Sequence, residues 1–138
     1  MFALNPRLAN DTFEIGALEL SRLLLMNDAT YPWVILVPQR NDVRELYELT
    51  VADRRLLMDE IARVSETLVH VFHPDKLNVA ALGNIVPQLH VHLVARFATD
   101  ASWPDPVWGK HPAKAYAPRD AQDLIGRLAD HLGLSESY

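Results

Sequence analysis

The chain has 138 residues, of which 49% are hydrophobic and 22% are charged, and it contains no cysteine. This length and composition predict one folded domain with a hydrophobic core, and they exclude a disordered chain, a disulfide framework and zinc sites built from thiolates. The net charge is −5, with acidic and basic residues interspersed, which argues against a surface that binds long nucleic acids. A pocket for a small phosphorylated ligand is compatible with these numbers.

The N-terminal region predicts neither a targeting signal nor regular structure. Residues 1–7 lack the basic and apolar regions of a signal peptide, and the longest apolar runs of the chain are too short to span a membrane. We therefore expect a cytoplasmic protein. Residues 1–17 contain Asn-Pro and Asn-Asp-Thr sequences that are typical of turns, so we expect this region to be irregular.

Two strands and a long helix are predicted next. Residues 21–26 form the first expected strand, a turn follows at 27–30, and residues 33–37 are continuously apolar, as in a strand covered on both faces. A capping pattern at Thr50 then introduces an amphipathic helix of about 20 residues, which ends at residues 73–75. Its apolar positions recur at steps of three and four: Leu57, Ile61, Val64, Leu68 and Val71.

The remaining pattern alternates strands and loops before a final helix. We expect strands at 76–82 and 88–97, joined by a short loop and therefore antiparallel neighbours. Residues 101–118 hold several prolines and are expected to be irregular, and 120–132 predicts a second amphipathic helix.

Together these elements predict an α+β fold: a mostly antiparallel sheet with one long crossover helix and a C-terminal helix. We expect a single domain over residues 1–138, in which residues 98–138 form a C-terminal extension rich in proline and tryptophan.

The most informative segment is the last predicted strand. Because side chains alternate along a strand, Gln88, His90 and His92 share one face, and the apolar residues between them face the other way. Imidazole is the side chain best suited to nucleophilic attack, proton transfer or metal binding near neutral pH.

Three interpretations of this pair of histidines compete. They can be polar residues on the solvent face of a sheet, or two ligands of a metal whose further ligands come from His70, His73 or His111. The third interpretation is nucleophilic catalysis, in which a neutral imidazole attacks phosphorus and forms a covalent phosphoramidate.

The sequence around these residues resembles the histidine triad family. Residues 87–94 (PQLHVHLV) resemble its motif, His-x-His-x-His followed by apolar residues, and residues 24–27 and 34–38 resemble its nucleoside-binding hairpin. The long helix and the segments at 77–78 and 83–84 follow in the family's order, so the resemblance covers about residues 15–97.

The resemblance implies a nucleotide hydrolase or nucleotidyl transferase that acts at the α-phosphate of a dinucleoside polyphosphate or a nucleoside phosphoramidate. His90 corresponds to the nucleophile and His92 to the third histidine of the motif. Gln88 stands where the first histidine would be; its amide cannot titrate near neutral pH but still forms hydrogen bonds. Gln88 and His92 would contact phosphate oxygens or the leaving group.

The resemblance also implies roles for residues outside the motif. Asn27 or Asp28 would bind the ribose hydroxyls, and phosphate or pocket contacts are expected from Asn78, Gly83 and Asn84. No cofactor is required, although a divalent cation can accompany polyphosphate substrates, and a homodimer is expected. The alternatives are a catalytically weak nucleotide-binding module or a His-x-His metal-binding protein.

Four further residues stand out, and three of them carry open alternatives. Trp33 is expected in the core. Trp103 and Trp108 are expected to cap the pocket, stack on a base or contact a partner. Arg96 continues the face of the histidines, where it would approach a phosphate or form a salt bridge at the edge of the sheet.

Overall fold

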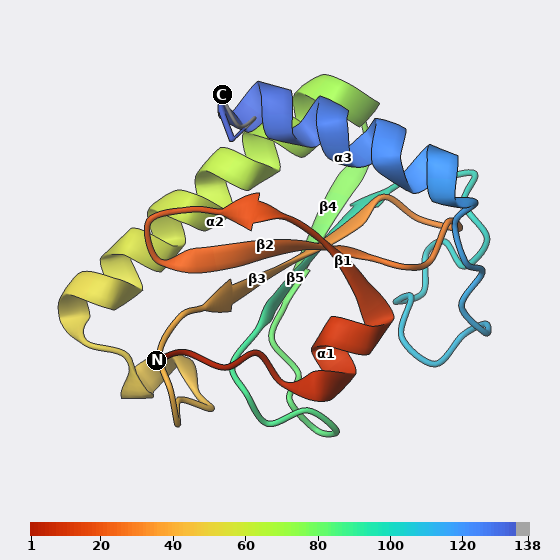
Figure 1. Ribbon diagram of the computed structural model, residues 1–138. Coiled ribbons are helices and arrows are strands. Elements are labelled where there is room, and N and C mark those ends of the chain that lie inside the picture. Colours follow the sequence, from red (N-terminus) through yellow and green to blue (C-terminus); the bar gives the residue numbers. More distant parts are fainter. Residues whose placement is uncertain (135–138) are drawn as a thin grey trace.

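The computed structural model describes residues 1–134; residues 135–138 of the expected C-terminal extension lie outside the described residues (Figure 1). The elements in chain order are α1 (Pro6–Asp11), β1 (Thr12–Ala17), β2 (Ser21–Met26), β3 (Trp33–Pro38), the 3-10 helix η1 (Leu46–Glu48), α2 (Val51–Phe72), β4 (Lys76–Ala80), β5 (Val91–Arg96) and α3 (Pro118–Leu132). Within residues 1–134 no helix is long and apolar enough to cross a membrane.

The strands form one five-stranded sheet in the order β1-β2-β3-β5-β4, and every neighbouring pair is antiparallel. The connection from β3 to the β4–β5 pair runs through α2. The predicted α+β fold, with its long crossover helix and C-terminal helix, is therefore confirmed.

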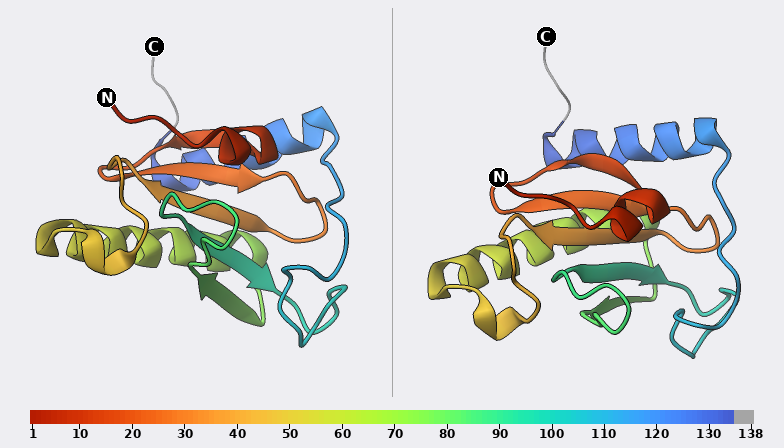
Figure 2. Two further views of the ribbon diagram at one scale, coloured as in Figure 1. Left: turned by 90° about the horizontal axis from the view of Figure 1, so that it is seen from below. Right: turned by 60° about the horizontal axis from the view of Figure 1, so that its bottom comes forward.

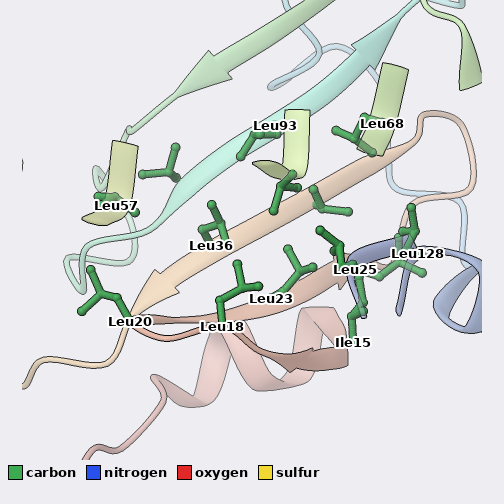
Figure 3. Close-up of a cluster of buried hydrophobic side chains, with 14 of the residues drawn as sticks. Ile15, Leu18, Leu20, Leu23, Leu25, Leu36, Leu57, Leu68, Leu93 and Leu128 are labelled. Atoms are coloured by element: carbon green, nitrogen blue, oxygen red, sulfur yellow. The ribbon is translucent and has the colours of Figure 1, made fainter. Parts of the chain in front are cut away.

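The two faces of the sheet bury different clusters. On one face, Leu36 and Leu93 of the central strands pack against Leu57 and Leu68 of α2 and Leu128 of α3 (Figure 3). The opposite face is covered by α1 and by loops, and the views of Figure 2 show α1 and α2 on opposite sides of the strands. A binding site can form on this second face, in the region that no helix covers.

Local sequence explains the helix α2. The Thr50 side chain accepts a hydrogen bond from the Asp53 N–H at 3.1 Å, and His73 ends the helix in a left-handed conformation with φ 52°. Within the helix, the Glu60 carboxylate is buried and accepts a hydrogen bond of 2.8 Å from the Leu20 N–H. The predicted cap and end of this helix are therefore confirmed.

The expectation of an irregular N-terminus is wrong, because residues 6–17 form α1 and β1. Asn5 caps α1 by accepting a hydrogen bond from the Arg7 N–H, and Pro6 occupies the first turn, where its missing N–H costs nothing. A helix of this length is too short for a visible hydrophobic period. The register of β1 shifts between Glu14 and Gly16, so its alternation of polar and apolar residues is interrupted.

The last two predicted strands are shorter than expected, although they do pair antiparallel. β4 ends at Ala80, and β5 begins at Val91 instead of residue 88. The Leu89 N–H donates to the Val43 carbonyl, outside the sheet, so the segment before Val91 is held by loop contacts. The C-terminal helix begins two residues before the predicted start, because Pro118 suits its first turn.

Candidate active site

His90 and His92 lie together in a cavity of about 390 Å³ on the face of the sheet opposite α2. β3 and β5 form its floor, α1 forms one wall, and the loop 82–86 and Trp108 form others. The two imidazoles are 7% and 6% exposed, and their ring centroids are 4.9 Å apart. The alternative of two solvent-facing histidines is therefore excluded, since both rings are buried.

The hydrogen bonds of His90 fix which nitrogen is available for chemistry. Its Nδ1 lies 2.7 Å from the backbone carbonyl oxygen of Gln88. A carbonyl can only accept, so Nδ1 carries the hydrogen and donates it. In the neutral ring, Nε2 therefore holds the free lone pair.

His92 is held in the opposite tautomer by Trp33. The Trp33 indole Nε1–H donates to His92 Nδ1 at 3.0 Å, and because indole nitrogen only donates, Nδ1 must be the unprotonated nitrogen. Burial, and secondarily the charge of nearby His90, lowers the pKa of His92 from 6.5 to about 4. His92 is thus a neutral ring at neutral pH that presents Nε2–H as a donor.

Aromatic rings surround His92 on the cavity wall. Trp108 meets it edge-on with centroids 5.3 Å apart, and Trp33 meets Trp108 in the same way at 5.8 Å. Trp33 is buried as expected, but it also orients a site residue. Of the two tryptophans in the proline-rich segment, Trp108 lines the cavity, whereas Trp103 stacks on Arg96 at 5.7 Å.

The Gln88 side chain is directed to the N-terminal segment. Its Oε1 accepts from the Asn5 N–H at 2.8 Å, and its Nε2 donates to the Ala3 carbonyl at 2.9 Å. Both polar atoms of the amide are therefore engaged by the backbone of residues 3–5. Gln88 precedes β5, so strand alternation does not set its direction.

Three other residues that were expected to contact the ligand are hydrogen-bonded to other parts of the protein. The Asn27 side chain accepts from the Tyr116 N–H at 2.9 Å, and buried Asp28 accepts from the Thr30 and Lys114 N–H groups. Asn78 Oδ1 accepts from Arg96 Nη1 at 2.8 Å. Gly83 and Asn84, by contrast, do line the cavity with His90 and His92. Gly83 has φ 80°, a conformation that favours glycine, and this lets the loop turn at the cavity.

Sequence reasoning missed two charged residues of the site, Arg7 and Asp11. Both lie on α1 and line the cavity, and their side chains approach to 3.7 Å across one helical turn. They were missed because the helix α1 was not predicted. The signal that would have found it is the pair Asn5-Pro6, a capping residue followed by a proline suited to the first turn.

Arg96 has a structural environment. Its guanidinium is 1% exposed and donates to both carboxylate oxygens of Asp100, at 2.8 and 3.1 Å. It also donates to Asn78, Ser102 and the Asp105 carbonyl, and it lies over the Tyr31 ring. The hydrogen bond from Arg96 lowers the pKa of Asp100 to about 2. The predicted salt bridge is present, but it is buried and starts from the inner strand β5, not at an edge as expected.

The metal interpretation lacks a third ligand in the part of the chain that the structure describes. Across residues 1–134 no group of three or more histidine, aspartate or glutamate side chains is placed to hold a metal ion. The chemistry available here is that of a buried lone pair on His90, a neutral donor on His92 and the charges of α1.

Comparisons with known proteins bear on the family and the fold. The sequence matches the HIT domain family over residues 7–99. The structure is similar to a histidine triad protein from Bradyrhizobium japonicum, with 46% identity and a TM-score of 0.93, covering 95% of this chain and 98% of that chain. A histidine triad protein from Marinobacter aquaeolei VT8 gives 46% identity and a TM-score of 0.94, with 96% and 97% covered.

A third solved structure, of a histidine triad protein from Sinorhizobium meliloti 1021, has 42% identity and a TM-score of 0.93, with 95% of this chain and 97% of that chain covered. A comparison with curated proteins gave no significant match.

Proposed function

The chain belongs to the HIT domain family, and from this premise we propose that its cavity binds a nucleotide which His90 cleaves at the α-phosphate. The observation that carries the proposal is the hydrogen bond from His90 Nδ1 to the Gln88 carbonyl, which leaves Nε2 as the free lone pair in the cavity. The substrate class is a nucleotide conjugate, either a dinucleoside polyphosphate or a nucleoside phosphoramidate.

The proposed reaction has two displacements. His90 Nε2 attacks the α-phosphorus, the bond from phosphorus to the leaving group breaks, and the leaving group departs with the electron pair. The resulting imidazolium keeps its Nδ1–H on the Gln88 carbonyl, which stabilises the positive charge. Water or another acceptor then attacks phosphorus and releases its proton to solvent, the P–N bond breaks, and the electron pair returns to Nε2.

Neighbouring groups would stabilise the charge that grows on the phosphoryl oxygens. His92 Nε2–H is a preorganised donor in a buried site, where a hydrogen bond to a developing charge is worth more than in water. Arg7 would add a positive charge at the rim. The proposed chemistry uses no resident cofactor, and a divalent cation would enter with a polyphosphate substrate.

The nucleoside would lie against the apolar part of the cavity. Leu8, Ile35, Val86 and Trp108 offer surfaces on which a base can pack. Asp11 is a carboxylate on this cavity and would accept hydrogen bonds from the ribose hydroxyls. Because the side chain of Asn27 already accepts from the N–H of residue 116, and that of Asp28 from the N–H groups of residues 30 and 114, the ribose role fits Asp11 better.

The test is turnover of adenosine 5′-phosphoramidate and of diadenosine polyphosphates by the wild-type protein and by His90→Ala. We expect the variant to lose at least roughly a thousandfold in kcat while it binds AMP with little change, because the nucleophile is removed and the cavity walls remain. A nucleotide trapped on His90 should be detectable by mass spectrometry. Full activity of His90→Ala would end the proposal.

The competing function is a nucleotide-binding module with weak turnover, and it predicts AMP binding without cleavage of either substrate. We also propose a cytoplasmic homodimer. The exposed apolar residues of α2 and the edge strand β4, which include Met58, Val69 and Val79, support a second copy of the chain as the partner.

A further inference from the structure

We infer that Gln88 is a positioning residue, whose side chain holds α1 in place as a wall of the nucleotide cavity. This inference rests on the proposed function only for what binds in the cavity. Gln88 occupies the position that the motif gives to its first histidine, yet its amide is bonded to the N-terminal segment.

The amide matches the backbone it binds. In an extended segment, the carbonyl of one residue and the N–H two residues later point in the same direction, as in the edge of a strand. Gln88 Nε2 donates to the Ala3 carbonyl and Oε1 accepts from the Asn5 N–H, so one side chain makes the two bonds that the N–H and C=O of a residue in a neighbouring strand would make. Glutamate lacks the donor, and an imidazole cannot aim its two nitrogens side by side in this way.

These bonds hold the segment from which α1 begins. Asn5, which Gln88 holds by its N–H, is also the residue whose side chain caps the helix at Arg7 N, at 2.9 Å. From there Leu8 is buried in the cluster beneath the cavity, and Arg7 and Asp11 reach the cavity itself. Through the capping residue Asn5, the Gln88 side chain therefore influences the positions of Arg7 and Asp11.

The backbone of Gln88 contacts the other side of the same site. Its carbonyl accepts the hydrogen bond from His90 Nδ1 at 2.7 Å. One residue therefore fixes the tautomer of the proposed nucleophile through its main chain and the position of α1 through its side chain. A side-chain substitution at residue 88 separates these two effects, because it leaves the carbonyl in place.

The experiment compares Gln88→Leu, which removes both side-chain bonds, with Gln88→Glu, which keeps the acceptor and loses the donor. Gln122→Leu, on the exposed surface of α3, is the matched control. We expect amide hydrogen exchange in residues 3–11 to rise at least about tenfold in Gln88→Leu and less in Gln88→Glu, with no change in the control. The affinity for AMP should fall about fivefold to tenfold in Gln88→Leu.

Kinetics separate positioning from direct catalysis. With adenosine 5′-phosphoramidate, KM should rise about fivefold to tenfold in Gln88→Leu while kcat falls less than about threefold, since His90 keeps its hydrogen bond. In an Arg7→Ala background the effect of Gln88→Leu on KM should be much smaller, because both changes disable the same wall.

Two results would overturn the inference. Unchanged exchange in residues 3–11 of both Gln88 variants would show that the amide does not hold the segment. A large loss of kcat with KM and exchange unchanged would place Gln88 on the reacting phosphate. The exchange measurement needs no nucleotide, so an inactive wild-type protein would count against the proposed function and leave this test intact.

Discussion

At the residue scale, the site is organised by two imidazoles in opposite tautomers. His90 donates through Nδ1 to a carbonyl, and His92 accepts at Nδ1 from an indole. The consequence is a lone pair and a donor at corresponding nitrogens of neighbouring rings, the two groups that the proposed attack on a phosphate would use.

The buried neutral state of His92 should make stability depend on pH. Because its folded-state pKa is about 4 and its ordinary value is 6.5, the unfolded chain binds a proton that the folded chain does not bind between these values. The stabilisation is complete above pH 6.5 and is lost as the pH falls through about 4. This amounts to about 3 kcal/mol in the free energy of unfolding.

His92→Asn is the comparison for this prediction, because the asparagine oxygen can accept the Trp33 N–H without titrating. Urea unfolding of both proteins between pH 4 and 7 should give a shallower pH dependence for the variant. Parallel curves would contradict the assignment of the slope to His92.

The indole of Trp33 provides a second prediction at this scale. Trp33→Phe keeps an aromatic ring but removes the donor to His92, so the tautomer of His92 is no longer fixed and Nδ1 is left unpaired. We expect about a tenfold loss of kcat on adenosine 5′-phosphoramidate and a loss of about 1–2 kcal/mol in stability. Trp103→Phe, outside the cavity, should leave kcat unchanged; equal kinetic effects in the two variants would refute this role.

At the element scale, the sequence predicted the helices and strands that have long hydrophobic patterns. The helix α2 and the strands β2 and β3 follow from a hydroxyl cap, a helical period and continuous apolar runs, and each was confirmed. The short helix α1 and the bulged strand β1 were missed, because neither has a period long enough to recognise.

The sequence predicted part of the site. His90 and His92 share a cavity, as the alternation of the predicted strand indicated, although β5 begins at Val91 and His90 lies just before it. The direction of Gln88 depends on a contact with residues 3–5, more than 80 positions away along the chain. Long-range contacts of this kind leave no local pattern, and the same holds for Asn27 and Asp28.

The loop after β5 depends on one buried ion pair, and this predicts a large effect of a single substitution. Arg96→Met leaves the Asp100 carboxylate buried without its partner, so we expect a loss of about 3–5 kcal/mol in the free energy of unfolding. Lys110→Met breaks the exposed pair with Asp105, which water screens, and should cost far less stability. Urea denaturation of both variants checks the difference; equal losses would mean that Arg96 is not the anchor of this loop.

At the scale of the whole molecule, the proposed homodimer would cover the exposed edge of the sheet. Light scattering should give twice the monomer mass of 15.6 kDa for the wild type. Val79→Lys places a charge on the edge strand β4 and should shift the protein toward the monomer, whereas Gln122→Lys on α3 should not. A monomeric wild type at micromolar concentration would rule out the dimer.

The start of β5 at Val91 has a consequence for how such a site can diversify. His92 belongs to the sheet and is tied to β3 through Trp33, whereas His90 precedes the strand and shares its loop with the cavity wall at 82–86. Insertions and substitutions in that loop can reshape the pocket without shifting strand register. Substitutions in residues 81–87 can therefore change which substrate is accepted, while the donor on β5 keeps its position.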